Sequence, residues 1–126
     1  MGKKILIVDD SRQDRKIIQR FLHKAGYGDL VLVETGEEGV LKAETEAPDL
    51  VITDTKLPGI DGFEVCRQIK EKSLPGNPKI IMMTGAIDAV DAVKARKMGA
   101  DDYCAKTSDY ATLIDAVGQI LREGQN

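Results

Sequence analysis

The stretch Ile5-Leu6-Ile7-Val8-Asp9-Asp10-Ser11 places four branched apolar residues directly before two adjacent acidic ones. Four consecutive apolar residues, without polar alternation, are typical of a strand that is buried on both faces of a parallel sheet. Two neighbouring carboxylates repel each other, so their position at the end of such a strand requires an explanation. A bound divalent cation would remove that repulsion, and the rest of the sequence favours this interpretation.

Further short apolar runs alternate with segments of helical periodicity along the chain. The five predicted strands are Lys4–Val8, Leu30–Val33, Leu50–Thr53, Lys79–Met83 and Asp102–Ala105. The connections between them are too short for anything but right-handed crossovers between parallel strands. The sequence therefore predicts an α/β fold, (βα)5, with a doubly wound five-stranded parallel sheet in the flavodoxin-like order 2-1-3-4-5.

Start and stop signals mark the helical segments. Ser11 and Asp14 have the spacing of a capping box at the start of the first helix, and Gly26 is placed to end it. The other predicted boundaries are a cap at Asp61, a helix end at Gly99 and a last helix over about Ser108–Arg122. The final residues, Glu123–Asn126, are predicted to fray.

Composition restricts the class of protein. The 126 residues are predicted to form a single domain, 1–126, and their 42% apolar and 31% charged content is ordinary for a globular protein. The net charge of −3 provides no basic face for nucleic acid, and no apolar run reaches the roughly 18 residues of a membrane span. Without a signal-peptide core or metal-spaced cysteines, the chain is predicted to be cytoplasmic and free of disulfides.

Polar residues follow the predicted strands at the edge where ligands bind in such sheets. Strand one ends in Asp9 and Asp10, and strand three in Asp54; Thr84 and Lys106 follow strands four and five. Because strands one and three are neighbours in the predicted order, three carboxylates meet in one pocket beside a hydroxyl and an ammonium. Each residue alone has an ordinary structural role, as a cap or a solvated lysine, but five such coincidences at one edge favour a functional site.

The charges in this pocket favour a hard divalent cation. Two carboxylates about 5 Å apart repel by about 3 kcal/mol at an effective dielectric near 20. Three carboxylates leave a net charge of −2 even after Lys106 is counted, which is a large cost for a domain of ordinary stability. All-oxygen ligation suits Mg²⁺ or Mn²⁺, whereas zinc prefers histidine or cysteine.

A metal ion beside a lysine and a hydroxyl indicates phosphoryl transfer, in which positioning and charge neutralisation do most of the work. Asp9 and Asp10 are predicted to hold the metal. Asp54, alone at the tip of its strand, is the predicted nucleophile, which would become an aspartyl phosphate. Lys106 and the Thr84 hydroxyl would bind the transferred phosphoryl oxygens.

At these residues the sequence resembles the response-regulator receiver domains of two-component signalling. The resemblance covers essentially the whole chain, through "ILIVDDS", "LVITDTKLPGIDGFEV", "IMMTG" and "GADDYCAK" in matching order and spacing. It implies that Asp54 accepts a phosphoryl group from the phosphohistidine of a sensor histidine kinase or of a histidine phosphotransfer protein in a phosphorelay.

The resemblance also assigns roles around Asp54. Lys106 matches the phosphate-binding lysine, and Thr84 and Tyr103 match the positions that shift on phosphorylation. The implied Mg²⁺ ligands are Asp9, Asp10, Asp54 and the backbone carbonyl of Lys56.

Some positions differ from the usual receiver pattern. Thr107 stands where receivers commonly have a proline, preceded by a cis bond, after the pocket lysine. Lys56 places a long cation two residues past Asp54, and Ala86 places a methyl group two residues past Thr84. In the family these two positions modulate how fast the phosphoryl group is lost.

Two classes of function are consistent with this pocket. The first is a phosphorylation-activated switch that catalyses its own phosphorylation and dephosphorylation, without a separate substrate, and signals by contact with a downstream protein. It resembles single-domain regulators of the chemotaxis or phosphorelay type, or a receiver cut from a longer protein, with no nucleic-acid or membrane partner on this chain.

The second class is a true enzyme, a Mg²⁺-dependent aspartyl-phosphate phosphatase of the haloacid dehalogenase type. In that family a second acid follows the nucleophile by two residues, where this chain has Lys56. A flavodoxin is a weaker alternative, because it would need a hydroxyl-rich phosphate loop after strand one, where this chain has acids.

Overall fold

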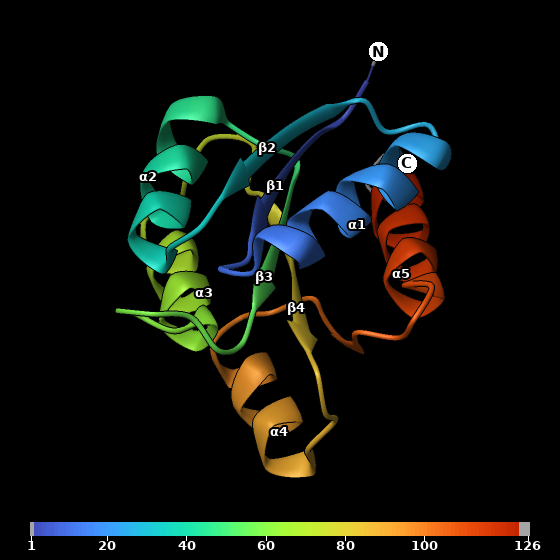
Figure 1. Ribbon diagram of the computed structural model, residues 1–126. Helices are drawn as coiled ribbons and strands as arrows, with labels where there is room; N and C mark the ends of the chain where they lie inside the picture. The colour runs from blue at the N-terminus through green and yellow to red at the C-terminus, as the bar shows by residue number, and fades with distance from the viewer. Residues whose placement is uncertain (1, 124–126) are drawn as a thin grey trace.

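The computed structural model describes residues 2–123, so the predicted fraying of Glu123–Asn126 falls almost wholly outside the described residues. Strands and helices alternate throughout (Figure 1). The strands are β1 (Lys4–Val8), β2 (Asp29–Val33), β3 (Leu50–Asp54), β4 (Lys79–Thr84) and β5 (Asp102–Ala105). The helices are α1 (Arg12–Lys24), α2 (Gly36–Glu46), α3 (Gly62–Glu71), α4 (Ala89–Lys97) and α5 (Ala111–Glu123).

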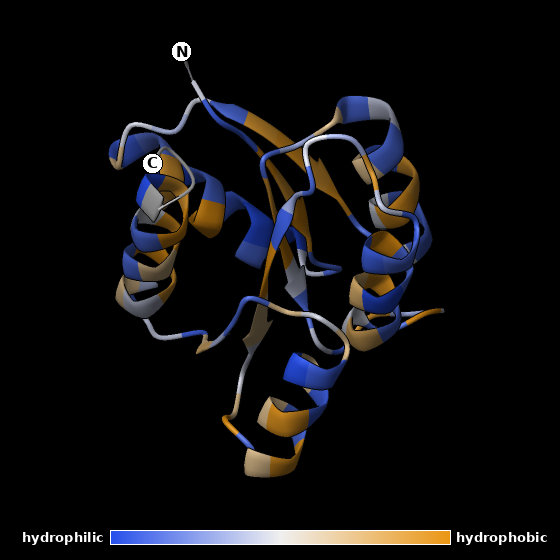
Figure 2. Ribbon diagram, turned by 180° about the vertical axis from the view of Figure 1, so that it is seen from behind, coloured by the Kyte–Doolittle hydropathy of each residue, from blue (hydrophilic) through white to orange (hydrophobic). Residues whose placement is uncertain are grey.

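The five strands form one parallel sheet in the order β2-β1-β3-β4-β5, which confirms the predicted topology. In β1, Ile5 and Ile7 join a core cluster with α1 and α5, whereas Leu6 and Val8 join one with α2, α3 and α4. Figure 2 shows mostly hydrophobic strands between helices that carry both hydrophilic and hydrophobic residues. This burial on both faces explains why the opening run is apolar without alternation.

The predicted helix ends at Gly26 and Gly99 are confirmed. Both glycines follow a helix with positive φ, 100° and 102° respectively. After α1, the Gly26 N–H donates to the carbonyl of His23 and the Tyr27 N–H to that of Leu22, the paired bonds of a Schellman motif. Asp61 caps α3 as predicted, because its carboxylate accepts the N–H of Glu64 at 2.9 Å.

The predicted start of the last helix at Ser108 is wrong, because α5 begins at Ala111. The intervening residues form a turn in which the Tyr110 N–H donates to the carbonyl of Thr107 and Tyr110 has φ of 53°. The Asp109 carboxylate then accepts the N–H of Ala111, the first residue of the helix, at 3.0 Å. The helix therefore begins three residues later than predicted.

The two cysteines are free and buried on opposite faces of the sheet, Cys66 on the α3 side and Cys104 on the α5 side. Burial raises the pKa of the Cys66 thiol to about 11 and that of Cys104 to about 12, so neither is a reactive thiolate near neutral pH. Within residues 2–123, none of the helices has the length and apolar character needed to cross a membrane.

Candidate functional site

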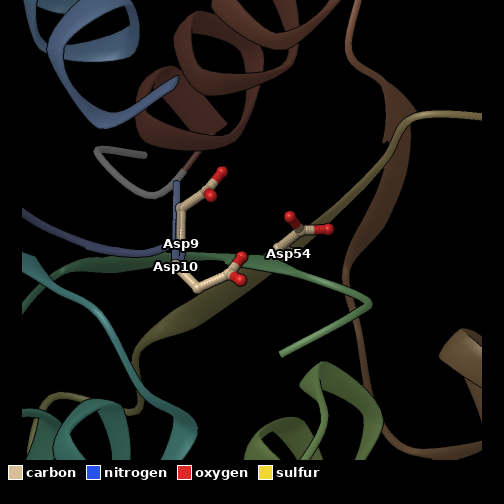
Figure 3. Close-up of side chains that lie close together, drawn as sticks. All are labelled: Asp9, Asp10 and Asp54. Atoms are coloured by element: carbon tan, nitrogen blue, oxygen red, sulfur yellow. The ribbon is translucent and has the colours of Figure 1, made fainter. Parts of the chain in front are cut away.

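The carboxyl ends of β1 and β3 bring three acidic side chains together (Figure 3). Asp9 and Asp10 directly follow β1, and Asp54 is the last residue of β3, its neighbour in the sheet. Each of the three offers a carboxylate oxygen that lies within 4.8 Å of the other two. The predicted convergence of these acids is therefore present.

Lys106, which follows β5, reaches into the same cluster. Its backbone N–H donates to the Thr84 carbonyl at 2.8 Å, which extends the pairing of β4 and β5 by one residue. Its ammonium lies 2.8 Å from Asp9 Oδ2, 2.8 Å from Asp54 Oδ2 and 2.9 Å from Asp14 Oδ2. The bond between Lys106 and Thr107 is trans, and the lysine occupies the pocket without the proline that is common in the family.

Burial and charge act in opposite directions on these groups. Asp9 is fully buried, and this burial raises the pKa of its carboxyl, against the opposing effect of hydrogen bonds from Lys106 and from the Ser11 N–H. Burial alone would lower the pKa of Lys106, but hydrogen bonds to Asp54, Asp9 and Asp14 together outweigh burial and raise that pKa. The ammonium is therefore charged at neutral pH and compensates part of the acidic charge.

A hard divalent cation fits the chemistry of this donor set. Asp9, Asp10, Asp14 and Asp54 carry a formal charge of −3 even when Lys106 is counted, so negative charge remains uncompensated. The three clustered ligand atoms are all carboxylate oxygens, and Asp10 is exposed, so water can complete a coordination shell. The site opens into a cleft of about 610 Å³.

Lys56 also borders this cleft, and its backbone N–H donates to Asp54 Oδ1 at 3.4 Å. Its side chain is exposed. Lys56 and Lys106 therefore donate to different oxygens of the Asp54 carboxylate, Lys56 to Oδ1 and Lys106 to Oδ2. The predicted role of the Lys56 carbonyl as a metal ligand remains a prediction.

Thr84 lines the cleft beside Asp54 and Lys106, whereas Tyr103 lies at a separate cavity. The Thr84 hydroxyl donates to the Ala86 carbonyl at 2.9 Å, so it is bonded to its own loop. Tyr103 pairs in register with Met82, two residues before Thr84 on the adjacent strand. Its hydroxyl is buried without a hydrogen-bond partner among the described residues, and its side chain borders a cavity of about 230 Å³ beside α4.

The predicted capping box at the start of α1 is only half formed. Ser11 Oγ accepts the backbone N–H of Asp14 at 3.2 Å, as predicted, but the Asp14 carboxylate does not return to Ser11. It accepts from Lys106 instead, while the Ser11 N–H donates to Asp9 Oδ1 at 2.9 Å. A charged ammonium is a stronger partner than a neutral N–H. Sequence spacing gave no signal for this pair, because the two residues are 92 positions apart.

Replacing Lys106 with methionine should lower the free energy of unfolding at pH 7 by about 3–5 kcal/mol, because the buried Asp9 loses its cationic partner. The measurement is urea denaturation followed by circular dichroism, without metal. Lys97→Met, on the exposed surface of α4, is the control and should change little.

The same Lys106 variant has a pH signature. In the wild type, the hydrogen bond from Lys106 opposes the rise that burial causes in the pKa of Asp9, so without Lys106 this pKa is raised further above its ordinary value of 3.8. The folded variant therefore binds a proton at a higher pH than either the folded wild type or the unfolded chain does. Stability is therefore regained as pH falls through that raised pKa, and the deficit should shrink between pH 7 and pH 4. A deficit that is absent at pH 7, or that grows on acidification, would contradict this electrostatic description.

Comparison with known proteins gives one consistent result. A family model described as the response regulator receiver domain matches residues 5–118. The alkaline phosphatase synthesis transcriptional regulatory protein PhoP of Bacillus subtilis is 39% identical over 125 residues, which cover 99% of this chain and 51% of that protein. The chain thus spans about half the length of the curated relatives it matches.

Two solved structures extend the comparison to the fold. A CheY-like response regulator receiver domain protein from Methanospirillum hungatei has a TM-score of 0.88 and 30% identity, covering 99% of this chain and 98% of that one. The beryllofluoride-activated receiver domain of DrrB, a Thermotoga maritima protein, has a TM-score of 0.82 and 31% identity, covering 97% and 99%. These matches give no support to a phosphatase of the haloacid dehalogenase type.

Proposed function

Because this chain belongs to the response regulator receiver domain family, we propose that it is a phosphorylation-activated switch with Asp54 as the phosphoacceptor. The observation that carries the proposal is the position of the Asp54 carboxylate, held by Lys106 at 2.8 Å at the end of a buried strand and facing an open cleft. One of its oxygens would attack the phosphorus of a phosphohistidine. The P–N bond breaks, a P–O bond forms, and the released imidazole nitrogen takes a proton.

The groups around Asp54 have two further roles in the proposed reaction, binding the phosphoryl oxygens and holding the metal ion. Lys106 would keep its ammonium against the phosphoryl oxygens after transfer, because its hydrogen bonds to carboxylates outweigh the opposing effect of burial and keep it charged. Mg²⁺, held by Asp9, Asp10, Asp54 and the Lys56 carbonyl, would supply charge neutralisation of the phosphoryl oxygens. Mn²⁺ satisfies the same ligand set.

We propose further that Thr84 and Tyr103 form the switch. Phosphorylation raises the charge on Asp54 from one negative unit to nearly two. The new oxygens would attract the Thr84 hydroxyl, which must then leave the Ala86 carbonyl. Space is available for Tyr103 to follow, since it borders a cavity and its hydroxyl makes no hydrogen bond among the described residues that would be lost.

Amide NMR with and without beryllofluoride, a mimic of the bound phosphoryl group, tests the switch. In the wild type, shifts should extend from Asp54 to β5 and α5. In Thr84→Ala, Asp54 should still bind beryllofluoride, but the shifts around Tyr103 should be largely lost, because the hydroxyl that joins the two positions is missing. Equal shifts around Tyr103 in both proteins would contradict the coupling, and no shifts in the wild type would contradict the function.

The partners follow from the chemistry of the family. We propose that a sensor histidine kinase or a histidine phosphotransfer protein supplies the phosphoryl group, and that the remodelled face formed by α4, β5 and α5 contacts a downstream protein. Residues 1–126 are proposed to form one receiver domain. A cytoplasmic location remains a prediction.

A further inference from the structure

Asp14 holds a position in the pocket that the proposed reaction does not use. It lies in the first turn of α1, and its carboxylate accepts a hydrogen bond from Lys106 at 2.9 Å. The side chain is 31% exposed, whereas that of Lys106 is 14% exposed and that of Asp9 is fully buried. Asp14 is therefore the outermost of the three acids on this lysine.

The carboxylate of Asp14 is not needed to build α1. The cap at the start of this helix is the bond from the Asp14 backbone N–H to Ser11 Oγ, which is independent of the Asp14 side chain. Lys106 is also positioned without it, because Asp9 and Asp54 each hold the ammonium at 2.8 Å. What the Asp14 side chain contributes is its negative charge and the hydrogen bond that it accepts from Lys106.

The hydrogen-bonding capacity of Lys106 is fully used by carboxylates. An ammonium has three N–H donors, and here they are directed to Asp9, Asp14 and Asp54. A phosphoryl group on Asp54 brings new oxygens and additional negative charge to the same ammonium. Asp14 therefore competes with the phosphoryl oxygens for a donor, and its charge repels them.

We propose that Asp14 is a positioning residue that acts through Lys106 to bias the pocket toward cation binding and against the phosphorylated state. The inference rests on the proposed function, because it concerns an anion bound at Asp54. It predicts effects of opposite sign on two ligands. Removal of the charge should weaken Mg²⁺ binding, since less negative charge remains, and should strengthen binding of a phosphoryl mimic.

Asp14→Asn is the informative variant, because asparagine keeps the size of the side chain and removes its charge. Its dissociation constant for Mg²⁺ should rise by about three- to tenfold, and the beryllofluoride concentration for half-saturation at saturating Mg²⁺ should fall by a similar factor, as expected when one partly screened charge is removed from the pocket. Both are measured by amide NMR titration. Asp14→Glu, which keeps the charge, should restore wild-type behaviour in both titrations.

Asp29→Asn is the matched control, because it removes the same charge from an exposed residue at the start of β2, at the opposite edge of the sheet. It should change neither affinity. If Asp14→Asn weakens both ligands, changes only one of them or changes neither, the inference is wrong, and the same holds if Asp14→Glu behaves like Asp14→Asn. Beryllofluoride binding by Asp54→Asn equal to that of the wild type would instead overturn the proposed function.

Discussion

Replacement of Asp54 by asparagine should abolish the phosphoryl group that the wild-type protein acquires from acetyl phosphate in the presence of Mg²⁺. The neutral amide is a far weaker nucleophile than the carboxylate, and the buried acid beside it is not free to substitute for it. Asp9 is fully buried and bonded to Lys106 and to the Ser11 N–H. Intact-protein mass spectrometry measures the gain of one phosphoryl group, which hydroxylamine should remove.

Asp49→Asn is the matched control for that experiment. Asp49 directly precedes the other end of β3, where its carboxylate accepts the backbone N–H of Lys4 at 2.8 Å. This variant should be phosphorylated as fully as the wild type. Full modification of Asp54→Asn would contradict the assignment of the nucleophile, and modification of the wild type that does not depend on Mg²⁺ would contradict the proposed role of the metal.

Substitution of Gly62 by alanine should lower the free energy of unfolding by about 3 kcal/mol, at the upper end of the range for overpacking. An added Cβ would overlap the carbonyl oxygen of Asp54 and lie 2.9 Å from its carbonyl carbon and 3.0 Å from Thr55 Cα. These are backbone atoms, which cannot rotate away. Relief therefore requires a shift between the start of α3 and the end of β3, which would displace the phosphoacceptor as well.

Urea denaturation followed by circular dichroism measures this loss, and Gly28→Ala serves as the control. A Cβ at Gly28 would meet nothing within 4 Å, so that variant should change stability by less than about 1 kcal/mol. If the two alanine variants were equally stable, the close approach of α3 to Asp54 would not exist in solution. The Gly62 variant should also accept less phosphate than the Gly28 variant.

The sheet and its order could be predicted because the strand signals are local. The run from Ile5 to Val8 is apolar in every position, and the structure buries all four side chains completely. By contrast, α2 has little local signal. It packs two glycines, Gly36 and Gly39, against neighbouring elements, so close backbone approach replaces the apolar stripe that marks α1, α3 and α5.

The pocket could be predicted only in part for a similar reason. Residues that end strands are brought to one edge of the sheet by topology alone, so the sequence predicts the meeting of Asp54 and Lys106. Which hydrogen bond each side chain makes depends on how far it extends and on which residues the fold places near it, and sequence spacing does not show this. Thus Asp14 resembles a cap in the sequence but contacts Lys106, and the Thr84 hydroxyl is bonded to Ala86 rather than directed at the acids.

The most direct test of the central claim is to locate the phosphoryl group without any mutation. After reaction with acetyl phosphate and Mg²⁺, borohydride reduces an aspartyl phosphate to homoserine, and peptide mass spectrometry reads its position. Homoserine at position 54 alone, formed only in phosphorylated protein, is the predicted result. Homoserine at position 9, 10 or 14, or at none of the acids, would contradict the assignment of Asp54 as the phosphoacceptor.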